Sequence, residues 1–174
     1  GRSCGKKMYI VLFRWEDVAT FTKDEKGVKV TAFAFAEGKK PIGVYATPST
    51  INIYATSEGE DDARGYIHHV DFEHPGTSLE FDEMMNANIN ANLGAIVMGC
   101  SGGDAKIAGT PCTPLQVTQD NSQDNKEGNK NIVQLASSLR SGPLGRIAKS
   151  LIPMTDDDEV NAVLGLPAAD ATGL

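Results

Sequence analysis

The chain has 174 residues, a formal net charge of −7 and a sequence pI of about 4.9. This length fits a single domain, and the acidic balance argues against a nucleic-acid-binding surface, because such surfaces neutralise phosphates with Lys and Arg. Eighteen glycines with few aromatic residues favour a strand-rich fold. Three cysteines without paired spacing argue against a disulfide scaffold, and neither a signal peptide nor a membrane-spanning apolar run is visible.

The N-terminal part predicts strands preceded by an arm. Residues 1–7 are expected to form a flexible N-terminal arm, and the apolar run MYIVLF (8–13) predicts a buried strand. The alternating stretch VKVTAFAFAE (28–37) is apolar on both faces, so each face needs a cover. A helix, a second sheet or a neighbouring subunit would serve, and we predict that Phe33 and Phe35 contact a neighbouring subunit.

Two further strand candidates follow the turn GKKPIG. They are VYAT (44–47) and INIYAT (51–56), which are separated at Pro48 and Ser49. The next segment, SEGEDDARG (57–65), is rich in carboxylates and predicts a loop or hairpin tip. Its acidic residues lack the spacing of a calcium-binding loop, which indicates a solvated surface.

All three histidines lie in the stretch GYIHHVDFEHPG (65–76), together with two carboxylates. These are the residue types of metal sites and of acid–base catalysis. In a strand, however, His68 and His74 share the apolar face and lie about 20 Å apart, which is too far for one metal ion. His69 lies on the polar face with both carboxylates. The pattern therefore favours a two-faced strand that is closed by Pro75-Gly76 over a metal or catalytic site.

Residues 77–93 fit two patterns. Thr77 and Glu80 form a capping box, and an apolar stripe at helical spacing follows it. The alternation of Asn with apolar residues in NANINANL (86–93) is instead typical of a strand. The cap favours a helix over about residues 77–90.

The glycine-rich stretch GCSGGD contains the only candidate nucleophile motif. Gly99 and Gly103 flank Ser101 with the spacing of a nucleophile elbow, which requires a strand, a turn and then a helix. Here the segment after the turn, AKIAG (105–109), predicts a second strand. Residues 94–109 therefore predict a hairpin, and we expect the protein to be neither an enzyme nor a holder of any metal or cofactor.

The C-terminal part begins with a strand at PLQVTQ (114–119). The polar segment 119–130 lacks apolar residues and predicts a long exposed loop. NIVQLASSLR (131–140) and LGRIAKSLI (144–152) indicate two more strands. Residues 153–174 are expected to form an acidic short helix, within 155–165, and a tail.

The order of these elements resembles that of the tube-forming proteins of phage tails and related injection systems. The resemblance rests on the helix at 77–90, the hairpin through CSGGDAKIAGTP, the strand PLQV, the polar segment 119–130 and NIVQLASSLR, and it loosely covers residues 8–150. It implies a small β-barrel or sandwich that stacks as hexameric rings. It also implies a passive conduit without catalytic residues, through which DNA slides without specific binding.

We therefore predict a mainly β fold, a single barrel or sandwich over residues 8–152 with one flanking helix and extended arms. The predicted function is a self-assembling virion subunit, most closely a tail-tube ring protein that is made in the bacterial cytoplasm. Its partners would be further copies of itself and other virion proteins. The alternatives are another phage structural protein (a connector, decoration or fibre-base subunit) or a β-sandwich module that binds carbohydrate or protein. The predicted inter-subunit contacts are Phe33, Phe35, Asp120, Asp124, Lys126 and Lys130.

Overall fold

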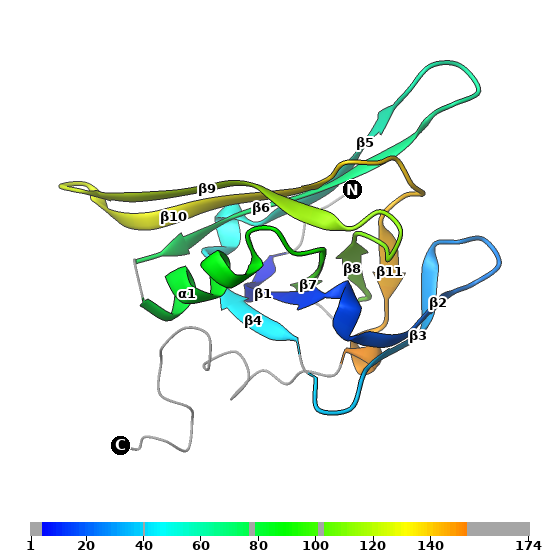
Figure 1. Cartoon of the computed structure of the whole chain (residues 1–174), viewed down its shortest axis with the longest axis horizontal. Helices are drawn as coiled ribbons and strands as arrows, with labels where there is room; N and C mark the ends of the chain where they lie inside the picture. The colour runs from blue at the N-terminus through cyan, green and yellow to red at the C-terminus, as the bar shows by residue number, and fades with distance from the viewer. Residues whose placement is uncertain (1–4, 40, 77–78, 101–102, 153–174) are drawn as a thin grey trace.

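Strands dominate the fold (Figure 1). The structure is a computed structural model that describes residues 5–39, 41–76, 79–100 and 103–152. The strands are β1 (Lys6–Arg14), β2 (Val18–Lys23), β3 (Lys29–Phe35), β4 (Ile42–Tyr45), β5 (Asn52–Glu58), β6 (Gly65–Pro75), β7 (Leu93–Gly99), β8 (Ala105–Ala108), β9 (Leu115–Asn125), β10 (Gly128–Ser137) and β11 (Gly145–Ile147). The α-helix is α1 (Leu79–Asn88), and short 3-10 helices lie at Trp15–Asp17, Pro48–Thr50 and Lys149–Leu151.

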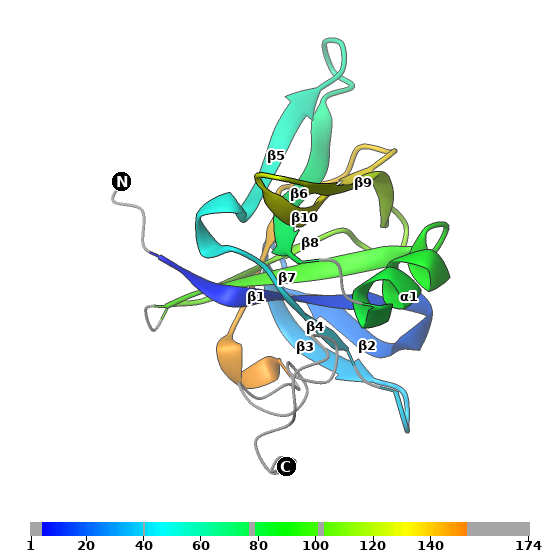
Figure 2. The ribbon, with the colours of Figure 1, turned by 90° about the vertical axis from the view of Figure 1, so that its left-hand side faces the viewer.

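All eleven strands belong to one sheet that bends over itself. Nine of them follow the order β2-β3-β11-β8-β7-β9-β10-β6-β5, while β1 pairs with β7 and β4. The two halves of the sheet meet at a single residue pair, Leu93 with Leu115. In Figures 1 and 2 the layer of β5, β6, β9 and β10 covers β1, β4 and β7. The prediction of a mainly β fold with one helix is confirmed, but the sheet is not closed into a barrel.

The first hydrophobic core fills the space between these two layers. Phe72 on β6 and Phe81 on α1 are its largest buried side chains, and Met85 on the next helical turn joins them. The buried members are Ile10, Leu12, Val44, Ala46, Ile51, Ile53, Val70, Phe72, Phe81, Met85, Leu93, Ala95, Val97, Ala108, Leu115, Val133 and Leu135. Burial of this much apolar surface, at roughly 25 cal/mol per Å², is the main source of stability.

A second core lies on the other side of β1, β7, β8, β11 and β3, and it is rich in aromatic rings. The ring of Phe13 meets those of Trp15 and Phe33 edge to face, with centroids 4.8 and 5.3 Å apart. Gly94 on β7 lies directly against this group, because a Cβ atom there would come within 2.4 Å of the Phe13 ring. Glycine at this position therefore leaves room for the Phe13 ring directly against β7.

The helix prediction for about residues 77–90 is confirmed for residues 79–88, while residues 89 and 90 form a turn. α1 runs from Leu79 to Asn88, while residues 77 and 78 lie outside the described residues. Phe81 and Met85 are buried as the apolar stripe predicts, but Ile89 is 40% exposed because the helix has already ended. Asn residues after Asn88 form the turn into β7, so the strand interpretation of 86–93 is wrong.

The predicted long loop at 119–130 is instead a β-hairpin. β9 and β10 pair from Leu115–Ser137 to Asn125–Gly128, and only Lys126 and Glu127 form the turn. Low apolar content suggested a loop, because such a segment cannot bury itself. The backbone hydrogen bonds between β9 and β10, however, do not require buried side chains. The two strands are already paired in the body of the sheet, and their pairing continues outwards through this polar segment.

Two other sequence expectations also change. β1 begins at Lys6, so the predicted arm at 1–7 shares its last two residues with the sheet. β2 was not predicted, because its sequence VATFTK is half polar, yet it pairs with β3 as an edge strand. The predicted short helix and tail within 153–174 lie outside the described residues.

Candidate functional site

β6 carries all three histidines and presents them on two faces, as the alternation predicts. His68 and His74 are 1% and 3% exposed, while His69 lies half-buried on the opposite face. The two buried rings have separate sets of partners and do not converge. Within the described residues, no cluster of three or more His, Cys, Asp or Glu side chains is placed to hold a metal ion.

The His68 imidazole ties three segments together. Its Nδ1 accepts a hydrogen bond from the Gly109 backbone N–H at 2.8 Å, so its Nε2 must carry the proton of the neutral ring and donates to the Gly142 carbonyl at 2.8 Å. The backbone N–H of His68 donates to Ser137 Oγ at 3.0 Å. Burial lowers the pKa of His68, and the charge of Lys23 lowers it further, while the Gly142 bond acts in the opposite direction. The ring is therefore a neutral structural bridge.

His74 fastens β6 to β4 and to the helix. Its Nδ1–H donates to the Tyr45 carbonyl at 2.8 Å, and its ring stacks on Phe81 with centroids 4.0 Å apart and planes 3° from parallel. Burial lowers its pKa, while the Tyr45 bond and the charge of Asp82 raise it. These partners account for its burial without a catalytic role.

The exposed face of β6 carries a small polar cluster. The ring of His69 stacks on Tyr54 at 4.7 Å, and its Nε2 lies 3.2 Å from Thr56 Oγ1. The Tyr54 hydroxyl donates to the Asp71 carboxylate at 3.3 Å, and burial together with that carboxylate raises the Tyr54 pKa. These are cross-strand pairs of β5 and β6, which stabilise the sheet.

The nucleophile motif lies in the turn between β7 and β8. Ser101 itself is outside the described residues, but the elements on either side are the two antiparallel strands that the sequence predicts, β7 and β8. A nucleophile elbow requires a helix after the turn, and β8 stands there instead. Cys100 and Cys112 are both exposed.

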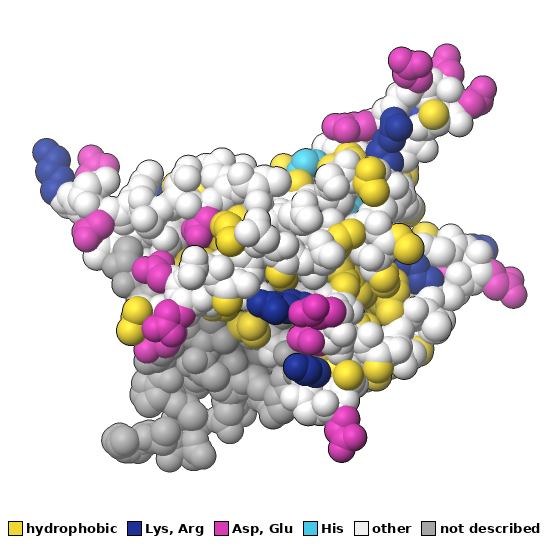
Figure 3. Space-filling view, in the orientation of Figure 1, with side chains coloured by type: hydrophobic (Ala, Val, Ile, Leu, Met, Phe, Trp, Pro, Cys, Tyr) yellow, Lys and Arg dark blue, Asp and Glu magenta, His cyan; other side chains and the backbone are white. Residues whose placement is uncertain are grey.

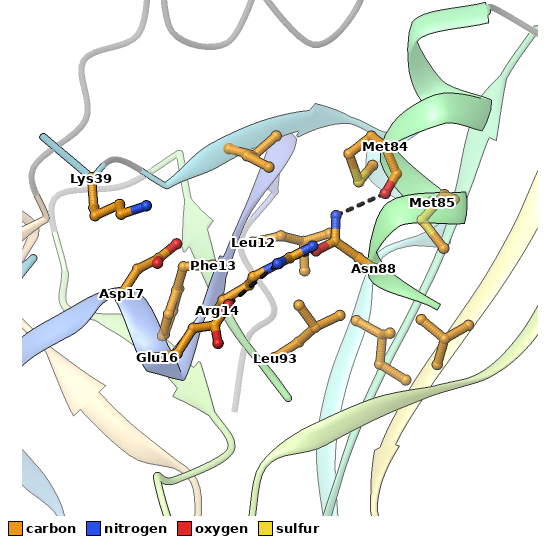
Figure 4. A pocket seen from close by; sticks show the side chains of 13 residues that line it. Leu12, Phe13, Arg14, Glu16, Asp17, Lys39, Met84, Met85, Asn88 and Leu93 are labelled. Atoms are coloured by element: carbon orange, nitrogen blue, oxygen red, sulfur yellow. Dashed lines mark hydrogen bonds and ion pairs between the residues drawn. The ribbon is translucent and has the colours of Figure 1, made fainter. Parts of the chain in front are cut away.

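A pocket of about 250 Å³ opens between the end of β1, the helix and β9–β10 (Figure 4). Its apolar wall consists mainly of core side chains, among them Leu12, Met85, Leu93 and Leu135. Charged side chains form the rim: Arg14, Glu16, Asp17 and Lys39. An apolar wall with a charged rim suits a ligand that has an apolar group and a polar end.

Arg14 closes the pocket against the C-terminal end of α1. Its Nε donates to Asn88 Oδ1 at 2.6 Å, and its guanidinium also donates to the Ala87 carbonyl at 2.9 Å and to Glu16 at 3.2 Å. Asn88 in turn donates to the Met84 carbonyl at 2.7 Å. A cation here stabilises the negative end of the helix dipole. Arg14, Glu16 and Asn88 are thus engaged with one another or with the helix backbone at the edge of the pocket.

The structure places two predicted contact residues inside the chain. Phe33 is 7% exposed, and Phe35 is half-buried against Phe13 with ring centroids 5.7 Å apart. Little of the Phe33 ring is thus accessible in the single chain, and its contact with a neighbouring subunit stays a prediction. The bent sheet covers the face of β3 that carries Phe33 and Phe35, through Phe13 on β1, while Ala34 on the opposite face is exposed.

The other four predicted contacts share the β9–β10 hairpin. Asp124 and Lys126 lie exposed at its tip. Lys130 pairs with Glu73 at 3.2 Å and ties the base of the hairpin to β6. Asp120 lies near α1, where partial burial and the charge of Asp82 raise its pKa.

The pocket was missed by sequence reasoning. Arg14 and Asn88 are 74 residues apart, and neither belongs to a motif. The only local signal was the Asn-rich end of the helix, which did not indicate a partner. Comparison of the chain with protein-family models, with curated proteins and with solved structures finds no match. Among the described residues, no helix has the length and apolar character needed to cross a membrane.

Proposed function

We propose that this protein is a self-assembling structural subunit of a virion, most closely a ring-forming subunit of the tail-tube type. The supporting observation is the β9–β10 hairpin, which extends beyond the rest of the sheet (Figure 1). β6 pairs with β10 only as far as Lys130, and residues 121–129 are exposed on both faces. A two-stranded ribbon without a third strand or a hydrophobic face is marginal in water. A neighbouring copy would supply the missing cover.

The open edge of β9 supports the same proposal. Within the described residues, β7 meets β9 only at Leu115, which leaves the N–H and C=O groups along that edge from Gln116 to Asn125 without a strand partner. Long exposed edges are templates for strand addition by another chain. Closed assemblies remove such edges, because each subunit pairs with the next.

The surface chemistry suits a conduit. The exposed part of the hairpin is dominated by Gln, Asn and Ser, and the chain carries a net charge of −7. A wall of this kind attracts no phosphate backbone, since phosphate binding depends on Lys and Arg. DNA would pass without specific binding.

Assembly is the property to measure. Purified protein should sediment well above the 18.5 kDa of one chain and show rings or tubes by negative-stain microscopy. A variant in which residues 124–129 are replaced by Asn-Gly keeps the Gln123–Lys130 pair and offers a two-residue hairpin turn. It should remain folded, with an unchanged melting temperature, but assemble poorly. A wild-type chain that stays monomeric at high concentration would refute the proposal.

A second candidate, a protein-binding module, rests on the pocket beside Arg14. Its apolar wall and charged rim fit an apolar side chain of a peptide. Filling the pocket by Met84→Trp should then abolish ligand-induced increases in melting temperature in a screen of short peptides. If no peptide changes the melting temperature of the wild type, this candidate is excluded.

A further inference from the structure

Three cations stand side by side across β3, β11 and β8. Arg146 on β11 is the register partner of Lys29 on β3 and of Lys106 on β8. All three side chains are exposed. Neighbouring strands are about 4.8 Å apart, so three positive charges lie within roughly 10 Å of one another. Like charges in register repel, which makes this row unfavourable in an isolated chain.

Carboxylates do not offset the row. Among the described residues, none of the three cations takes part in an ion pair. Asp24, in the turn before β3, accepts hydrogen bonds from the backbone N–H groups of Val28 and Lys29. A fourth cation, Lys23, acts electrostatically on His68, whose ring contacts the Gly142 carbonyl. The positive charge of this region is therefore available to an external partner.

The row borders a hollow of about 260 Å³. Its lining joins the cations Lys106 and Arg146 to apolar side chains of Val28, Ala55, Pro143 and Leu144. We call this hollow, with Lys29 at its border, the basic notch. Cations beside a small apolar surface fit a carboxylate-bearing loop, which gains charge pairing and excludes water.

The tip of the β5–β6 hairpin has the opposite charge. Four exposed carboxylates gather there, as the acidic cluster at the upper right of Figure 3 shows, and they belong to Glu58, Glu60, Asp61 and Asp62. Arg64 lies behind them, 3.6 Å from Asp61, in a pair so exposed that it stabilises little. Arg140 lies against Gly59 at the base. We call the segment 58–62 the acidic tip.

We propose that the acidic tip of one copy docks in the basic notch of the next. The inference rests on the proposed function, which requires contacts between copies, and it names one of them. The two surfaces are different parts of the chain, and a contact in which each copy gives its tip to the next in one direction only is heterologous and head-to-tail. Such contacts close into rings or continue as filaments.

Charge reversal on each side tests the contact. The tip variant is Glu60→Lys with Asp61→Lys, and the notch variant is Lys106→Glu with Arg146→Glu. Each should raise the concentration at half-assembly at least about tenfold in low salt, because like charges then meet. A chain that carries all four changes should assemble again. The matched control, Glu37→Lys with Glu83→Lys, alters exposed charges outside both surfaces and should leave assembly unchanged.

The outcomes separate the contact from the function. If the wild type forms rings or tubes but the tip variant assembles equally well, or if the four-change chain is not restored while it remains folded, the contact is wrong and the proposed function stands. A wild type that only dimerises, in a manner sensitive to both reversals, supports the contact and refutes the function. If the notch variant loses its effect once residues 153–174 are removed, that acidic segment fills the notch and the tip does not.

Discussion

The body of the molecule and its two projecting hairpins are built from the same strands but depend on different forces. β10 shows the change along its length, from exposed Gly128 and Asn129 at the tip to Val133 and Leu135, which are 0% and 1% exposed in the body. The body is held by apolar burial, while the tips are held mainly by backbone pairing and bury no apolar core. Stability therefore resides in one region, and the surface available to partners resides in the other.

The largest effect should come from the centre of the body. Phe72→Ala removes a ring that is 1% exposed between the two layers of the sheet. The free energy of unfolding should fall by about 3–5 kcal/mol, because apolar contacts are lost and a cavity remains. Urea denaturation followed by circular dichroism measures this loss.

The conservative variant Phe72→Leu is the control for that experiment, and it should cost clearly less, since most of the volume is kept. If the alanine variant lost under about 1 kcal/mol, β6 would not lie over a packed core.

An intermediate effect should come from the junction of the helix with β1. Asn88→Ala leaves Arg14 without the 2.6 Å acceptor for its Nε, although Glu16 and the Ala87 carbonyl remain. A lost buried hydrogen bond costs about 1–3 kcal/mol. The same denaturation experiment should place this variant between Phe72→Ala and the hairpin variants. If Asn88→Ala lowered the free energy of unfolding as much as Phe72→Ala does, Asn88 would stabilise more of the structure than Arg14 and the last turn of α1.

The body was the more predictable region. The β6 strand, from Gly65 to Pro75, matches the sequence prediction because period-2 burial and turn residues at both ends are local signals. The β7–β8 hairpin followed from an apolar run and a glycine-rich turn, and α1 from its cap. Each of these features is determined by residues that lie close together in the sequence.

The remaining features depend on distant residues. The hairpin at 119–130 has no apolar pattern, and its strands exist because β10 pairs with β6, some 60 residues earlier in the chain. The packing of Phe33 on Phe13 of β1, 20 residues earlier in the chain, likewise follows from the bend of the sheet. The pocket could not be predicted from the sequence for the same reason, since Arg14 and Asn88 meet only after folding.

The pH dependence of stability should also originate in the body. Burial holds the pKa of His68 and of His74 below the ordinary value of 6.5. The unfolded chain therefore binds more protons below about pH 6.5, and the free energy of unfolding should fall as pH drops through 6.5 towards the lowered pKa values. Above pH 6.5 this contribution is fully present. Urea denaturation at intervals between about pH 5 and 7.5 measures the slope.

Single variants identify which histidine causes the pH dependence of the free energy of unfolding. His68→Phe keeps a buried ring but leaves the Gly109 N–H without its acceptor and removes the imidazole donor to the Gly142 carbonyl, so it should lower stability at pH 7.5 and reduce the slope. His69→Gln changes the exposed face of β6 and should leave the slope as it is, because both buried rings remain. A slope that persists after His68→Phe and His74→Phe together would assign the pH dependence to carboxylates.

The smallest effect on stability should be at the tip of the β9–β10 hairpin. Asp124→Ala with Lys126→Ala removes two exposed charges that touch no core residue, so the free energy of unfolding should change by less than about 0.5 kcal/mol.

Hydrogen exchange compares the tip of the hairpin with the body more sharply. In dilute protein the amides of residues 121–129 should exchange fast while those of Val133 and Leu135 are protected, because local opening follows exposure. In concentrated protein the tip should become protected as a neighbouring copy covers it. Equal protection of tip and body in the monomer would mean that the hairpin is stable by itself, and its exposure would then no longer argue for a partner.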